Sequence, residues 1–556
     1  MNVTAHIRQD ADAQERKRQL AQLLAARGAR QISEHPVSRG QQALWFLHEA
    51  APESPAYTVV CALRLRGALD TAALQRALQR IVDRHQQLRA GFHMQADGQL
   101  IQRIHGWREV ALPRTQLPPM PAPELERALM QAVARPFDLA QGPLFRPELF
   151  QIGPQDHILL LSVHHIVFDG WSLWLVMDEL RQAYAAEAEG RDTGWSPLPM
   201  SYVDHLTAQE AMIASDDADA ALAFWRDRLA GAQGVLDLPL DAPRPPLRAV
   251  RGESLRLALP PALSQSLGGL ARSLGTTTFS LLLGAWQILL ARWSGQDTVP
   301  VGTRSAGRGD PRAAGVVGYF VNPVVVVGHV DRAMRASDYL RATHAGVLEA
   351  LAHDALPFPT LVERLQVPRD PSTTPLFQAS FVLQKAQRGG GAMEMMAGAA
   401  DWAGLGVEFV DLPQQAGQFD LDLDMFEVGD SLRGVLKYDA ALFHPDSIAR
   451  LAESFATLLA ALVVPRPFVP WRVVLGVGAF MSLGQFALLG HIFVQPHASM
   501  ANAEQIGYAV AVPRDRPAIV HRDLAVIGAI FHHRQFVTIA GQGIGQRRPV
   551  ISLLQH

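Results

Sequence analysis

The apolar and polar positions between residues 36 and 465 follow two alternating periods. Segments such as 71–88 and 446–462 repeat apolar residues every three or four positions, which predicts amphipathic helices. The run at 157–163 is apolar throughout and predicts a buried strand, whereas 278–295 is long and apolar enough for a buried helix. Helical segments that alternate with short strands predict an α/β fold.

Composition narrows the class of protein. The chain has 556 residues, of which 48% are apolar and 19% charged, so it can bury sizeable cores in more than one compact unit. A formal charge of −3 gives no electrostatic reason to expect a nucleic acid partner. The single cysteine, Cys61, excludes an internal disulfide and a cysteine-cluster metal site. We interpret it as a buried apolar residue of a cytoplasmic protein.

The stretch SVHHIVFDGWS, at 162–172, carries the strongest candidate chemistry. A strand is predicted to deliver His164 and His165, and Asp169 and Gly170 follow just before a helix. Histidine has the pKa best suited to proton transfer near neutral pH. Neighbouring strand residues point to opposite faces, so one histidine would face a cleft while the other packs. From the residues alone the pair is either structural or catalytic.

The same stretch matches the HHxxxDG signature of condensation domains of nonribosomal peptide synthetases. The signature also marks a wider acyltransferase superfamily that resembles chloramphenicol acetyltransferase. Other segments resemble the family's further motifs in the expected order: SRGQQALWFLHE (SxAQxRLWxL), RHQQLRAGF (RHExLRTxF), VGTRSAGRGD (VGxPxAGR), VGYFVNP (IGxFVNTL) and RDPSTTPLFQASFVLQ (RDxSxxPLFQxxF). Departures occur at Gln86, at Pro323, at 202–205, where only the tyrosine and aspartate match, and at 353–358.

The resemblance implies a fold and a division of the chain. It implies two chloramphenicol-acetyltransferase-like α/β subdomains in a V-shaped pseudo-dimer, with the active site in the tunnel between them. We expect an N-terminal subdomain at 36–205 and a C-terminal subdomain at 206–465. Residues 1–35 would form a helical leader, and residues 466–556 a tail of different character.

The resemblance also implies an activity. A donor carrier protein and an acceptor carrier protein would present substrates as phosphopantetheine thioesters, and the acceptor amine would attack the donor to form an amide. The enzyme would need no cofactor of its own. The family's heterocyclising members carry paired aspartates, which this chain lacks, and the stretch DGWSLWLV differs from the epimerising DGVSWRIL. An L-configured donor is therefore expected. Two alternatives stay open: an acyltransferase that forms esters or uses a soluble amine, and an inactive domain that recruits partners.

Site residues follow from the same resemblance. His165 is expected to be catalytic, either as a general base or by positioning the amine, and His164 to be structural. Gly170 would keep the tunnel open and could turn its amide toward the thioester.

Three further residues complete the expected site. Asp169 would point away from the cleft and hold the loop through a buried ion pair with Arg308. Asn322 lies in a strand next to the site and is expected to contact substrate. Trp171 and Ser172 would pack and cap the following helix.

The two ends of the chain raise separate expectations. Residues 466–556 contain eight arginines and three acidic residues, with no sustained periodicity and no adenylation or carrier signature. This tail has three possible interpretations: a shifted reading frame or truncated gene, an unrecognised extension, or a membrane anchor at 473–494. Membrane attachment is the least favoured of the three. The charged helix within 1–35 could dock on an upstream synthetase or serve as a solvated linker.

Overall fold

A computed structural model describes most of the chain between residues 31 and 464. The described ranges are 31–232, 234–248, 251–368, 370–385, 400–413, 418–429 and 431–464. Of the expected leader, only the last residues are described, and they enter strand β1 (Ile32–Pro36). The expected tail at 466–556, with its candidate anchor at 473–494, lies outside the described residues.

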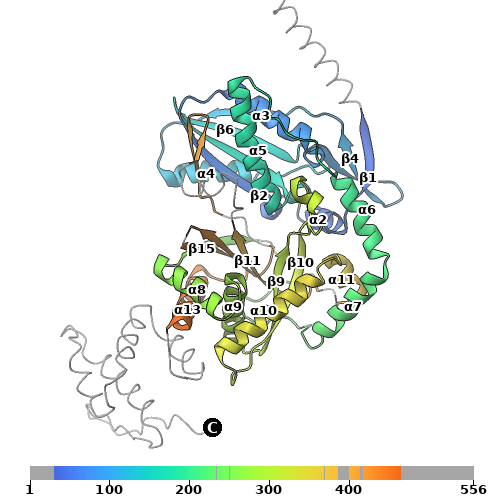
Figure 1. The fold of residues 1–556 in the computed structure, drawn as a ribbon, viewed down its shortest axis with the longest axis vertical. Coiled ribbons are helices and arrows are strands. Elements are labelled where there is room, and N and C mark those ends of the chain that lie inside the picture. Colours follow the sequence, from blue (N-terminus) through green and yellow to red (C-terminus); the bar gives the residue numbers. More distant parts are fainter. Residues whose placement is uncertain are drawn as a thin grey trace, which may run out of the picture. The chain divides into compact units, whose positions relative to one another are not determined.

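The first sheet has the strand order β12-β13-β2-β7-β6-β5. Its centre is the antiparallel pair of β2 (Thr58–Arg66) and β7 (Asp156–His164). Helices α3 (Thr71–Arg84) and α5 (Gly170–Glu189) lie side by side (Figure 1) and bury their apolar faces in one core against this sheet. Helix α4 (Ala122–Val133) packs in a second core on the opposite side. The other strands are β5 (Arg114–Gln116), β6 (Phe145–Gly153), β12 (Ala400–Trp402) and β13 (Leu405–Phe409).

The second sheet has the order β10-β9-β11-β14-β15-β8. This sheet has one apolar and one polar face, as strand β14 (Leu421–Val428) illustrates. The sequence of β14 begins by alternating leucine and aspartate, and successive residues of a strand point to opposite faces. Leu421 and Leu423 enter the apolar core, which helix α9 (Thr278–Ser294) also joins along its whole length. The remaining strands are β8 (Gly252–Ala258), β9 (Thr298–Ser305), β10 (Asn322–His329), β11 (Ala379–Lys385) and β15 (Ser431–Asp439). The other covering helices are α8 (Pro261–Ser273), α10 (Ala336–Ala352) and α13 (Pro445–Val463).

The C-terminal subdomain contributes part of its chain to the sheet of the N-terminal subdomain. Strands β12 and β13 follow β11 in sequence, yet they extend the first sheet, where β13 pairs antiparallel with β2. Trp402 is 1% exposed within the core of that sheet. The expected division at residue 205 falls inside α6 (Tyr202–Ile213), which continues toward α7 (Asp216–Arg228). The C-terminal half therefore supplies two strands that no local sequence pattern assigned to the first sheet.

Smaller elements surround these sheets. A three-stranded sheet has the order β1-β4-β3 and includes β3 (Ala90–Met94) and β4 (Leu100–His105). Helix α2 (Arg39–Ala50) begins with a capping box at Ser38, and α11 (Phe358–Arg364) contacts α2. In the described ranges no single helix is long and apolar enough to cross a membrane; α8 and α9 would be so together, but they are bent by 102°.

Candidate active site

A cavity of about 970 Å³ is lined by residues of both subdomains. The first subdomain contributes part of α2 and the turn after β7, and the second contributes β9 and the residues around 319–323. His165, His205, Arg304 and Tyr319 all line this space. A cavity of this size falls within the range of small-molecule sites.

His165 enters the cavity from a turn rather than from a strand. The sequence predicted both histidines on the strand, but β7 ends at His164, and His165 opens the 3-10 turn η3 (His165–Val167). The Nδ1 atom of His165 lies 2.6 Å from the carbonyl oxygen of Phe168. Because a carbonyl oxygen only accepts hydrogen bonds, Nδ1 carries the proton and Nε2 of the neutral ring is left as an acceptor. The ring also packs nearly perpendicular to the ring of Tyr319, with 5.2 Å between centroids.

The surroundings of His165 favour its neutral form. Burial lowers the pKa of the imidazole most, and the positive charge of Arg304 lowers it further. The carboxylate of Asp169 acts in the opposite direction but does not reverse the net lowering. At neutral pH the ring therefore holds one proton, on Nδ1, and can accept another on Nε2.

His164 has a structural placement. Its ring is buried, and its Nδ1 accepts a hydrogen bond of 3.1 Å from the backbone N–H of Ile166. The ring packs edge-on against His48 and Phe137. Burial holds the pKa of His164 well below its usual value, so this histidine stays neutral and fixes the turn.

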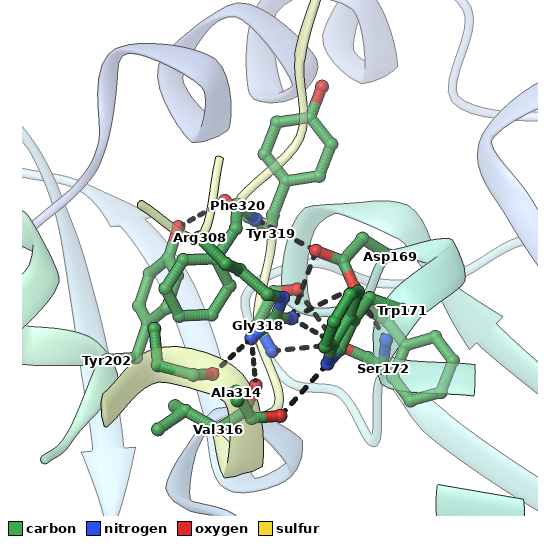
Figure 2. Close-up of polar contacts among 12 residues, drawn as sticks. Asp169, Trp171, Ser172, Tyr202, Arg308, Ala314, Val316, Gly318, Tyr319 and Phe320 are labelled. Carbon is green, nitrogen blue, oxygen red and sulfur yellow. Dashed lines mark hydrogen bonds and ion pairs between the residues drawn. The ribbon is translucent and has the colours of Figure 1, made fainter. Parts of the chain in front are cut away.

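The ion pair expected between Asp169 and Arg308 joins the two subdomains (Figure 2). Arg308 Nη2 lies 3.2 Å from both carboxylate oxygens, and the two side chains are 3% and 0% exposed. Asp169 also accepts hydrogen bonds from the backbone N–H of Ser172, at 2.7 Å, and of Phe320, at 3.2 Å. It therefore caps the start of α5 while holding the segment that carries Phe320.

The same cluster secures the loop after β9. Arg308 donates to the carbonyl oxygens of Ala313, at 2.6 Å, and Val316, at 2.7 Å. Trp171 donates from its indole N–H to the carbonyl oxygen of Ala314 at 2.9 Å (Figure 2). Neither Asp169 nor Arg308 is among the described residues that line the cavity. The pair thus acts on the site through the backbone that it holds.

Gly170 is the exposed first residue of α5. A Cβ atom added there would meet no atom within 4 Å, so the protein itself leaves room for a side chain. Gly170 is not among the described residues that line the cavity. Two roles were expected of Gly170: to keep the tunnel open and to turn its amide toward the thioester. Both remain predictions.

Asn322 supports a loop. Its side-chain nitrogen donates to the carbonyl oxygens of Asp354, at 2.8 Å, and Leu356, at 2.9 Å. Its side-chain oxygen accepts from the N–H of Phe358 at 2.8 Å. Both amide protons are therefore used within the protein, and although Asn322 borders the cavity, its donors are not free for the substrate contact expected from sequence.

Sequence reasoning missed a chain of buried glutamines behind His165. Gln41 donates to the carbonyl oxygen of Ile166, at 3.0 Å, and to the side-chain oxygen of Gln87, at 3.2 Å. Gln87 donates to Gln102, which donates to the carbonyl oxygen of Pro36. All three glutamines are 0% exposed. Gln41 lies in the motif SRGQQALWFLHE and Gln87 in the motif RHQQLRAGF, but only the fold brings them together beside the turn that carries His165.

Two further residues of the cavity, His205 and Arg304, were not predicted from the sequence. His205 lines the cavity with its ring centroid 4.6 Å from that of Phe320. Burial, with a further contribution from Arg308, lowers the pKa of His205 to about 4. The motif at 202–205 matched poorly at this position, and that departure was the available signal. In the described part of the chain, no group of three or more histidine, cysteine or acidic residues could hold a metal ion.

Replacing Asp169 by alanine should destabilise the fold. The change leaves Arg308 buried without its carboxylate, so we expect the free energy of unfolding in urea to fall by about 3–5 kcal/mol. Asp338→Ala is the matched control, because its pair with Arg341 is about half exposed on both sides and should contribute less than about 1 kcal/mol. Equal losses for the two variants would contradict the role given to the buried pair.

Gln41→Leu should also lower stability, by about 2 kcal/mol or more. It leaves Gln87, the N–H of Ser38 and the carbonyl oxygen of Ile166 without their partner, and each buried unpaired group costs about 1–3 kcal/mol. Gln42→Leu on the same helix is the control, because the Gln42 side chain is half-buried and has no hydrogen bond within the described residues. A loss no larger than that of the control in urea unfolding would show that the glutamine chain is dispensable.

Comparisons with known proteins agree with this architecture. The family model described as "Condensation domain" matches residues 31–465. A linear gramicidin synthase protein of Brevibacillus parabrevis is 36% identical over 434 residues, which are 77% of this chain and 8% of that protein. Phosphinothricin tripeptide synthetase PhsC of Streptomyces viridochromogenes is 35% identical over 436 residues, which are 78% of this chain and 39% of that protein. The chain thus spans a small part of these relatives.

Solved structures agree as well. The X-domain from teicoplanin biosynthesis is 27% identical, with a TM-score of 0.69 and coverage of 77% of this chain and 94% of that one. A four-domain nonribosomal peptide synthetase bound to AMP and glycine is 25% identical, with a TM-score of 0.70 and coverage of 78% and 33%. They confirm the expected α/β fold of two chloramphenicol-acetyltransferase-like subdomains. The chain belongs to the condensation-domain family of nonribosomal peptide synthetases.

Proposed function

We propose that this domain joins a carrier-bound acyl or peptidyl thioester to the amine of a carrier-bound aminoacyl group, with formation of an amide. The observation that supports this most is His165, a neutral histidine whose free Nε2 acceptor lies in a cavity lined by both subdomains. The phosphopantetheine arms would belong to the partner carrier proteins, so the reaction needs no cofactor from this chain.

His165 would act on the attacking amine. An amine that adds to a thioester carbonyl must lose a proton to become a neutral amide, and the Nε2 lone pair can accept that proton or hold the amine in line for attack. Phe168, by fixing the tautomer, keeps this lone pair available. The thiolate of the donor's pantetheine leaves as the amide forms.

The rest of the site would align the substrates. Holding two carrier-bound groups in one cavity replaces a bimolecular encounter by a reaction between positioned groups, which lowers the entropic part of the barrier. The Asp169–Arg308 pair and Gln41 fix the turn that carries His165, so the catalytic ring keeps its place while substrates exchange. Binding energy from the two arms can then be used for alignment.

Two of the departures from the family motifs, at Pro323 and at 353–358, give no support to an inactive, recruiting domain. Pro323 lies on β10, an edge strand of the second sheet, where a missing backbone N–H is tolerated. The degenerate segment at 353–358 is held in place by Asn322 and packs Phe358 against Phe377. Both departures therefore preserve the walls of the cavity.

His165→Ala should lower kcat/KM for amide formation by about 10²–10⁴, which is the usual contribution of proton transfer by a positioned side chain. Donor and acceptor carriers loaded with aminoacyl groups would be supplied, and the product followed by mass spectrometry. His329→Ala, at an exposed end of β10, is the control and should leave the rate unchanged. Equal yields from wild type and His165→Ala would overturn the assignment, and product from an alcohol acceptor alone would favour the ester-forming alternative.

His165 should titrate below the usual histidine pKa of 6.5. Since the folded-state pKa is lowered, the ring is neutral at pH 7 and takes up its second proton only as the pH falls below 6.5. Nuclear magnetic resonance of histidine-labelled protein measures this directly, with the signal assigned by its loss in His165→Ala. A titration midpoint at or above 6.5 would contradict the environment described for this ring.

A further inference from the structure

Arg304 is a cation in the wall of the cavity that the mechanism above does not use as a substrate contact. It lies near the end of β9, and its side chain is 23% exposed into a cavity that it shares with His165. It stands where the motif VGxPxAGR has proline, and its partner across the β9–β10 ladder is Pro323, one of the departures noted above. This chain has therefore placed a guanidinium where that motif has no donor.

Two buried carboxylates hold this guanidinium. Arg304 Nη2 donates to Asp422 at 2.7 Å, and Nη1 donates to Asp424 at 3.3 Å. Lys437 donates to the other oxygen of Asp424 at 2.6 Å, and Ser380 donates to Asp422. The two aspartate side chains are 5% and 4% exposed. The cluster thus contains two cations and two anions and is neutral as a whole.

Part of the guanidinium is left for a ligand. A guanidinium has five N–H groups. Nη1 gives one to Asp424, and Nη2 gives one to Asp422 and one, at 3.5 Å, to the side-chain oxygen of Gln418. The N–H on Nε and the second on Nη1 have no hydrogen bond to any described residue. Gln418 and Phe419 line the same part of the cavity, and the guanidinium carbon lies 5.9 Å from the Phe419 ring centroid.

We propose that Arg304 is a specificity-determining residue, whose free N–H groups bind an uncharged oxygen acceptor, such as an amide carbonyl, on the side chain of one of the two condensing substrates. This inference rests on the proposed function. Charge balance favours an uncharged acceptor, because Asp422 and Asp424 already neutralise Arg304 and Lys437. A carboxylate would lose its hydration without meeting net positive charge. An apolar side chain would leave the donors unpaired, which is the basis of discrimination by hydrogen-bonding sites.

A purely structural network is the competing explanation, and charge-matched variants separate the two. Arg304→Met alone would leave Asp422 and Asp424 buried with one cation, so it could simply unfold the domain. The double variant Arg304→Met with Asp422→Asn removes one charge of each sign. Arg332→Met with Asp297→Asn is the control, because it removes an exposed pair of the same composition, neither member of which is among the described residues that line the cavity.

The experiment compares glutaminyl, glutamyl and methionyl substrates, which have side chains of similar length. Each is loaded first on the donor carrier with a glycyl acceptor, and then on the acceptor carrier with a glycyl donor. In one of these two series we expect wild type to prefer glutaminyl over methionyl by about tenfold or more in kcat/KM. The ratio should fall to about one in the Arg304/Asp422 double variant and stay unchanged in the Arg332/Asp297 control. An unchanged ratio in the Arg304/Asp422 variant, or a preference for glutamyl, would overturn the proposal.

A binding measurement keeps this result separate from the proposed reaction. Glutaminyl and methionyl pantetheine thioesters are titrated into His165→Ala and into His165→Ala with the Arg304/Asp422 changes, so that no turnover is needed. Tighter binding of the glutaminyl thioester than of the methionyl thioester, lost in the protein with the Arg304/Asp422 changes, would support the subsite. It would do so even if wild type formed no amide, because that failure would refute only the proposed reaction. Amide formation without any glutaminyl preference in rate or binding would refute the subsite alone.

Discussion

The buried contact between Asp169 and Arg308 is the constraint on which the site depends. The carboxylate lies at the start of α5 in the first subdomain, and the guanidinium comes from the loop after β9 in the second. A charge pair with both members dehydrated tolerates little change in geometry, because the attraction offsets the lost hydration only at close range. The pair therefore fixes the spacing of the two walls between which the cavity forms.

Electrostatics and hydrogen bonding converge on the neutral state of His165. Burial and Arg304 disfavour a second proton, while the Phe168 carbonyl orders the one proton that remains. The charge of Arg304 is tolerated in the same cavity because the guanidinium donates hydrogen bonds to the buried carboxylates of Asp422 and Asp424. A protonated ring would have no lone pair on Nε2, so this arrangement of charges keeps the ring in the form that the proposed chemistry requires.

Much of the site could be predicted because its central residues are close together in sequence. His164, His165 and Asp169 lie in one segment, and Arg308 lies in a second motif, so a resemblance to the family indicated them directly. Gly170 lies in the same segment, but it is not among the described residues that line the cavity. The alternation of helices and strands likewise predicted the α/β class.

What escaped prediction depends on contacts between distant segments. The donors of Asn322 are used by a loop more than thirty residues further along, and Gln41 meets Gln87 and Ile166 only after the fold forms. No pattern in the sequence indicated that Arg304 would contact Asp422 and Asp424, which lie more than a hundred residues further along the chain. Hydrophobic periodicity reports which side of an element is buried, and not which partner covers it.

The contribution of β12 and β13 to the first sheet has a consequence for how such a protein can be divided. Without β13, the edge of β2 would expose unpaired backbone groups beside Leu63 and Leu65, which are almost fully buried in the described structure. An open, apolar strand edge is a template for pairing with other chains. We therefore expect that a cut between the two halves would leave an N-terminal fragment with an open edge at β2, prone to aggregate rather than to fold as a half-enzyme.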